Sequence, residues 1–190
     1  SGGAFDVTIG PLTRLWKLTK RDGRLPRETK LREARAITGW EMLQLHEDGS
    51  ASLERDGMRL NLGGIAKGYA ADEMLAILRE GGFPRSLVAA SGDIVAGDAP
   101  NGTEGWDVGL AGLPIGTDGM QPRMLLENQA VSTSGDLQQV ITIDGKRYSH
   151  IVDPRTGLGV IHQRLVTIIA PNGTTSDSLA TTLSVMEVQA

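Results

Sequence analysis

Apolar residues recur along the chain at steps of three and four, which predicts helices in several places. In residues 27–38 they are Leu31, Ala34 and Ile37, and Gly39 follows as a stop signal. Further helices are expected after the loop that opens the chain, after a glycine-rich turn, and near the end of the sequence. Each would present its apolar side to a core and its charged side to water.

Alternating or wholly apolar segments bounded by turn residues predict strands in the rest of the chain. A three-stranded meander is expected at residues 42–46, 51–55 and 58–62. The clearest hairpin pairs residues 140–143 with 146–151 through Asp144-Gly145. Other strands are expected at residues 86–90, 94–96, 106–110, 123–132 and 165–170, with a polar turn at residues 132–136. The pattern predicts an α+β fold with a mixed, largely antiparallel sheet and helices packed around it.

Composition narrows the class of protein. The 190 residues are 39% hydrophobic and 22% charged, as in a globular domain with a substantial core. A net charge of −4 argues against a general nucleic-acid binder, and the absence of cysteine excludes disulfides and thiolate metal sites. No apolar run approaches the roughly 18–20 residues that cross a bilayer. We expect a single domain over residues 1–190, cut at both ends because both termini are abrupt.

The most distinctive stretch is residues 61–72. Gly63 and Gly64 lie where a strand is expected to turn into a helix, and Lys67 adds a positive charge in the first turn. Glycine lets the backbone approach a ligand, and the free N–H groups of a helix start favour anions. The stretch therefore suits a phosphate-bearing ligand. A tight turn followed by a solvated lysine explains the same residues, and both interpretations stay open.

The last predicted helix places a carboxylate and a hydroxyl on one face. Thr175-Ser176 is expected to cap it, with Asp177 exposed in its first turn and Thr181 four residues later. Such a pair of hard oxygen ligands suits Mg²⁺. The pair also suits a helix without metal, because Asp stabilises a helix start and Thr can bond its own backbone.

Three histidines are present, and His150 is the one we single out. It lies at the end of a predicted strand, just before Asp153-Pro154, where it could meet a ligand. A strand histidine can equally be a hydrogen-bonded structural residue. His46 and His162 lie in ordinary strand or loop contexts and are read as structural or surface groups.

Taken in order, six segments of the chain resemble the ApbE-type family, the FAD:protein FMN transferases. They are residues 4–12 (AFDVTIGPL), 62–70 (LGGIAKGYA), 91–93 (SGD), 133–136 (TSGD), 150–157 (HIVDPRTG) and 177–182 (DSLATT). The resemblance implies a flavin transferase fold and a Mg²⁺-dependent enzyme. It would split the pyrophosphate of FAD, attach FMN to a threonine of a target flavoprotein and release AMP. Two alternatives are an FAD pyrophosphatase, as in some relatives, and a flavin-binding protein without turnover.

The same resemblance assigns roles to residues. The metal would be held by the main-chain carbonyl of Gly64 and by the side chains of Asp177 and Thr181. Lys67 would stabilise charge on the pyrophosphate, and His150 or Asp177 would orient or deprotonate the attacking hydroxyl, with neither chosen. Flavin contacts fall on Ala4, Phe5, Asp6, Asn61, Lys67 and His150.

Two positions depart from the family pattern. Asn61 stands where the family usually has Asp, which removes a negative charge beside the expected flavin site. Ser91 stands where the family usually has Gly, so backbone approach there would be looser. Family members are usually longer at both ends and mostly exported and membrane-anchored, which implies a periplasmic location that no segment of this sequence shows.

Overall fold

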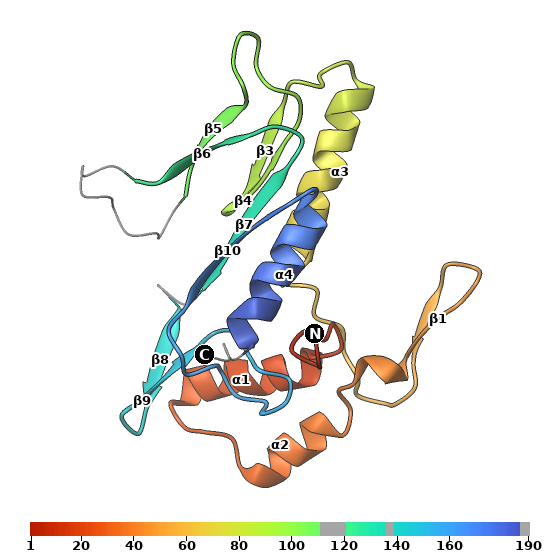
Figure 1. Ribbon diagram of the computed structural model, residues 1–190. Helices are drawn as coiled ribbons and strands as arrows, with labels where there is room; N and C mark the ends of the chain where they lie inside the picture. Colours follow the sequence, from red (N-terminus) through yellow and green to blue (C-terminus); the bar gives the residue numbers. More distant parts are fainter. Residues whose placement is uncertain (111–120, 136–138, 187–190) are drawn as a thin grey trace. The chain divides into compact units, whose positions relative to one another are not determined.

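The computed structural model describes residues 1–110, 121–135 and 139–186, with the elements labelled in Figure 1. The described chain divides into two compact units, one of residues 1–62, 139–163 and 185–186, the other of residues 63–110, 121–135 and 164–184. Helices and antiparallel sheets together confirm the predicted α+β class. Among the described residues, no helix combines the length and the apolar character needed to cross a membrane. A single domain over residues 1–190 stays a prediction.

The first unit packs two helices against a hairpin. Its elements are α1 (Gly10–Asp22), α2 (Glu28–Arg35), the 3₁₀ turn η1 (Trp40–Met42), and the hairpins β1–β2 (Leu43–Leu45, Ala51–Leu53) and β8–β9 (Val140–Ile143, Lys146–Ser149). The core centres on Trp16, whose ring lies 5.6 Å from that of Tyr148 and whose indole N–H donates to the carbonyl of Ser149 at 3.1 Å. The predicted hairpin at residues 140–151 and both helices are thereby confirmed.

The predicted third strand of the meander is wrong. Residues 58–62 form no strand beside β2, because their backbone groups pair with the N-terminal segment of the chain instead. The N–H of Asn61 donates to the carbonyl of Val7 at 2.7 Å, and that of Gly10 donates to Arg59 at 3.1 Å. A Cβ at Gly10 would lie 2.4 Å from the Arg59 carbonyl oxygen, so this close approach requires glycine.

The second unit is built on a four-stranded antiparallel sheet. Its strand order is β10 (Leu165–Ala170), β7 (Ala130–Gly135), β4 (Asp93–Ala96) and β3 (Leu87–Ala90). The helices α3 (Ala66–Glu80) and α4 (Gly173–Val185) run beside it in Figure 1. Val95 packs with Leu75 of α3, while its neighbour Ala96 packs with the pair β5 (Trp106–Gly109) and β6 (Arg123–Leu126). Because side chains alternate across a strand, Asp93 shares the α3 side with Val95.

One long strand predicted at residues 123–132 is two strands in different sheets. The chain turns at Asn128, which has φ of 49°, so β6 and β7 separate there. The polar turn predicted at residues 132–136 is also wrong, since Ser132 to Gly135 belong to β7 and pair with β10. Threonine and serine suit a strand whose hydroxyls find partners across the sheet. Asp136 lies outside the described residues.

The last helix begins earlier than predicted. It starts at Gly173, and the side-chain oxygen of Asn172 accepts from the N–H of Thr175 at 2.8 Å, so Asn172 does the capping. Asp177 therefore lies beyond the first turn, and it is 1% exposed. The expectation of an exposed Asp177 at a helix start is wrong. The first turn of α4 consists of the residues before Asp177, and the side of the helix that carries Asp177 is buried.

Candidate functional site

Two buried carboxylates share one lysine in the second unit. The Lys67 ammonium lies 2.9 Å from Oδ2 of Asp93 and 3.1 and 3.2 Å from the two carboxylate oxygens of Asp177. Asp93 is 3% exposed and Asp177 is 1% exposed, whereas the lysine side chain is 43% exposed. The three residues come from the start of β4, the first turn of α3 and the second turn of α4. Segments far apart in the sequence thus meet at one charged cluster.

A contact between two glycines lets α3 and α4 come this close. A Cβ at Gly68 would lie 2.0 Å from the carbonyl oxygen of Gly173, and one at Gly173 would lie 2.6 Å from the carbonyl oxygen of Gly68. The close approach allows the N–H of Gly68 to donate to Oδ2 of Asp177 at 3.1 Å. An early N–H of α3 is therefore committed to a carboxylate of the protein itself, and not left for an anion.

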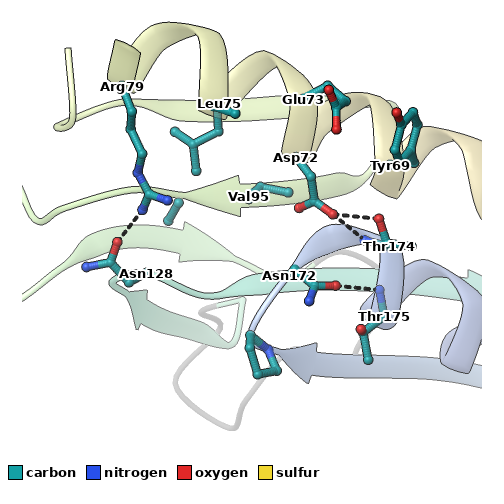
Figure 2. Close-up of a pocket in the computed structure, with 13 residues that line it drawn as sticks. Tyr69, Asp72, Glu73, Leu75, Arg79, Val95, Asn128, Asn172, Thr174 and Thr175 are labelled. Atoms are coloured by element: carbon teal, nitrogen blue, oxygen red, sulfur yellow. Dashed lines mark hydrogen bonds between the residues drawn. The ribbon is translucent and has the colours of Figure 1, made fainter. Parts of the chain in front are cut away.

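Asp72, the last residue of the glycine-rich stretch, joins the same two helices at a second point. Figure 2 shows its carboxylate reaching the start of α4, where it accepts from the N–H groups of Gly173 at 2.6 Å and Thr174 at 2.8 Å. A pocket of about 530 Å³ lies beside it, lined by residues that include Tyr69, Arg79 and Asn172. Because Asp72 and Asn172 already satisfy the first N–H groups of α4, this helix start is not an anion site.

Asp93 is the functional residue whose role the sequence left unassigned. It follows the two-residue turn Ser91-Gly92, where φ is 52° and 99°, as in the left-handed turns that join tight hairpins. Its register partner across the sheet is Ser132 of β7. The sequence places SGD among the segments that resemble the family, but only the tertiary structure brings Asp93 to Lys67. The position of Ser91 shows why glycine is favoured there.

The charges of the cluster do not balance. Burial lowers the pKa of Lys67, but hydrogen bonds and charges from Asp93, and then from Asp177, outweigh this effect and raise the pKa above its usual value. The lysine is therefore a cation at neutral pH. By formal charge, two carboxylates around one ammonium leave −1 in a site whose acids are almost fully buried. A buried surplus of charge is costly, and a bound cation would neutralise it.

The predicted metal ligands Gly64, Asp177 and Thr181 all belong to the second unit. Thr181 lies one turn further along α4, and its hydroxyl is 3.3 Å from that of Ser134 on β7. Gly64 lies in the turn just before α3, four residues from the Gly68 that bonds Asp177. In the described ranges, no three or more His, Cys, Asp or Glu side chains gather as a metal site. A cation at Asp177 would therefore need hydroxyl and carbonyl oxygens, which is the donor set expected for Gly64, Asp177 and Thr181.

The other predicted site residues belong to the first unit. Ala4 is 2% exposed and packs with Val160. Asp6 accepts from the N–H and hydroxyl of Thr8 at 2.7 Å and from the N–H of Trp40 at 3.1 Å, so it shapes the opening loop. The backbone N–H of His150 donates to the carbonyl of Gln139 at 3.0 Å.

Asn61 and Phe5 complete the set of flavin contacts predicted in the first unit. The Asn61 amide donates to the hydroxyl of Thr13 on α1 at 2.9 Å, while Phe5 is half-buried. Among the predicted residues, the structure brings Lys67 and Asp177 into direct contact within the second unit. Flavin binding by the residues of the first unit stays a prediction.

Comparison with known proteins shows the family. The chain matches the ApbE family over residues 1–190. It is 31% identical to an FAD:protein FMN transferase of Klebsiella pneumoniae and 30% identical to one of Salmonella typhimurium, covering 97% and 98% of this chain. The matched regions are 54% and 55% of those relatives, so the chain spans just over half the length of these proteins.

Solved structures agree with the sequence match. The ApbE protein of Thermotoga maritima has a TM-score of 0.83 at 34% identity, over 97% of this chain and 60% of that one. The apo flavinyl transferase ApbE of Pseudomonas stutzeri has a TM-score of 0.81 at 32% identity, over 97% and 57%. The fold is therefore the α+β fold of the flavin transferases. The chain belongs to the ApbE family, as its motifs predicted.

Proposed function

We propose that this chain acts as a Mg²⁺-dependent FAD:protein FMN transferase. It would split the pyrophosphate of FAD, attach FMN to a threonine of a target flavoprotein and release AMP. The observation that supports this best is the Lys67 cluster, in which the buried carboxylates of Asp93 and Asp177 surround one ammonium. The names of the ApbE relatives support the coarser part of this reaction, the transfer of FMN from FAD to a protein.

In this proposal Gly64, Asp177 and Thr181 hold the magnesium. When bound, the cation supplies positive charge to the pyrophosphate, whose transfer chemistry needs positioning and charge neutralisation more than covalent help. Lys67 adds a second positive charge. Its 43% exposed side chain can reach a phosphate oxygen, while its raised pKa keeps it protonated.

The threonine hydroxyl of the target attacks the phosphorus of the FMN half. A P–O bond forms to the threonine, the P–O bond to the bridging oxygen breaks, and AMP leaves with that oxygen. The hydroxyl proton passes to a general base, for which the family resemblance offers His150 or Asp177. Asp177 is the weaker candidate of the two, because both of its carboxylate oxygens already accept hydrogen bonds from Lys67 or Gly68. A carboxylate whose two oxygens already accept hydrogen bonds is poorly placed to take a proton.

The test is to incubate the chain with FAD, Mg²⁺ and a flavoprotein target, then to measure AMP and the mass of the target. AMP together with an FMN-modified target supports the transferase, and a Thr→Ala change at the acceptor should abolish the mass increase. AMP without modification would instead indicate an FAD pyrophosphatase. FAD binding without AMP would indicate a flavin-binding protein, and no FAD binding would contradict the proposal.

A further inference from the structure

The Lys67 ammonium has two anchors of different kinds. Asp93 lies at the start of a strand, held by the turn at residues 91–92 and by pairing with Ser132, and its contact with the lysine is the shorter at 2.9 Å. Asp177 lies on α4, and its Oδ2 also accepts from the N–H of Gly68. A lysine on a flexible four-carbon stem can keep one of these partners while it releases the other.

We propose that Asp93 is a positioning residue that retains Lys67 in the site and so lets it give up Asp177 to a divalent cation. This inference rests on the proposed function, because the cation is the magnesium assigned there. The ammonium and the cation both require the carboxylate of Asp177. With Asp93 present, the lysine that moves away from Asp177 still has a buried counter-charge within hydrogen-bonding distance.

Without Asp93, the lysine would have Asp177 as its carboxylate partner in the cluster. A metal ion would then have to displace the ammonium from that partner, and its affinity would fall. Removing the lysine itself should do the opposite, because no ammonium would then compete with the metal ion for the carboxylate of Asp177. The direction of each change follows from the competition between two cations for one carboxylate.

The test measures metal affinity without FAD, by calorimetric titration of Mg²⁺ and, as a spectroscopic probe, of Mn²⁺. We expect Asp93→Asn to weaken binding by roughly tenfold or more and Lys67→Met to tighten it by a similar factor. In the Lys67→Met background, Asp93→Asn should have a much smaller effect, since the lysine through which it acts is gone. Asp153→Asn is the matched control, because Asp153 is also a buried acid bonded to a cation, Arg155, in the other unit.

The outcomes distinguish a positioning role of Asp93 from a role as a metal ligand or as a charge. An equal effect of Asp93→Asn with and without the lysine would show that Asp93 acts as a ligand or through its charge alone, and would overturn the positioning role. Weaker binding in Lys67→Met would overturn it too, and this measurement stands even if the Asp93 variant does not fold. A metal affinity that is the same in wild type, Asp93→Asn and Lys67→Met contradicts this inference but not the proposed function. A wild-type chain that binds neither Mg²⁺ nor Mn²⁺ contradicts the proposed metal site and this inference together.

Discussion

Two substitutions at Asp177 separate its role as a hydrogen-bond acceptor from its role as a charge. Ala removes the acceptor and leaves the N–H of Gly68 buried without it, which costs about 1–3 kcal/mol. The Ala substitution does not leave a buried cation without a counter-charge, because Lys67 still contacts Asp93 and its side chain is 43% exposed. Asn keeps an oxygen for Gly68 and removes the surplus negative charge, so we expect a change of about 1 kcal/mol or less, in either direction.

Urea unfolding followed by circular dichroism gives the free energy of unfolding of each variant without metal. The order of stability should be wild type close to Asp177→Asn, with Asp177→Ala clearly lower. If Asn destabilises as much as Ala, the charge of Asp177 and not its acceptor oxygen stabilises the fold, and the reasoning from a surplus of buried negative charge fails.

Magnesium should also distinguish wild type from Asp177→Asn by its effect on the free energy of unfolding. A ligand that binds the folded state stabilises it by about 2.7 kcal/mol at a hundred times its dissociation constant. Wild type should gain such stability, and Asp177→Asn should gain little, although its metal-free stability is intact. A similar magnesium response in both proteins would exclude Asp177 as a metal ligand.

Three further substitutions test how the site is built, each by urea unfolding. Gly68→Ala should destabilise by more than about 3 kcal/mol, since its Cβ would meet a backbone carbonyl at 2.0 Å. Gly109→Ala is the control, because the nearest atom to its Cβ would be 3.6 Å away. Equal losses of stability in the two variants would refute the glycine contact. Asp72→Ala should cost about 0.5–2 kcal/mol because it removes the acceptor of the Gly173 and Thr174 N–H groups at the start of α4, and an unchanged midpoint would show that this contact is dispensable. Ser91→Gly should stabilise by about 0.5–1 kcal/mol by relieving a φ of 52°, and an unchanged or lower midpoint would show that Ser91 adopts this φ without strain.

The fold class and most of the elements could be predicted because they depend on local pattern. The hairpin at residues 140–149, the strand at residues 165–170 and the helix after Gly64 all follow from the spacing of apolar residues and the turn residues between them. The errors occurred where distant backbone decided the outcome. Residues 58–62 alternate like a strand, yet their hydrogen bonds go to the N-terminal segment, which no local pattern records.

The candidate site divides in the same way. Sequence motifs alone selected Lys67 and Asp177 and placed the chain in its family, because the types and order of these residues are distinctive. Only the tertiary structure decided that Asp177 is buried, that Asp93 completes the cluster and that the close contact of Gly68 with Gly173 permits it. Burial and charge balance are properties of neighbours in space. Three elements separated by up to 110 residues must pack before the surplus charge that would attract a cation exists.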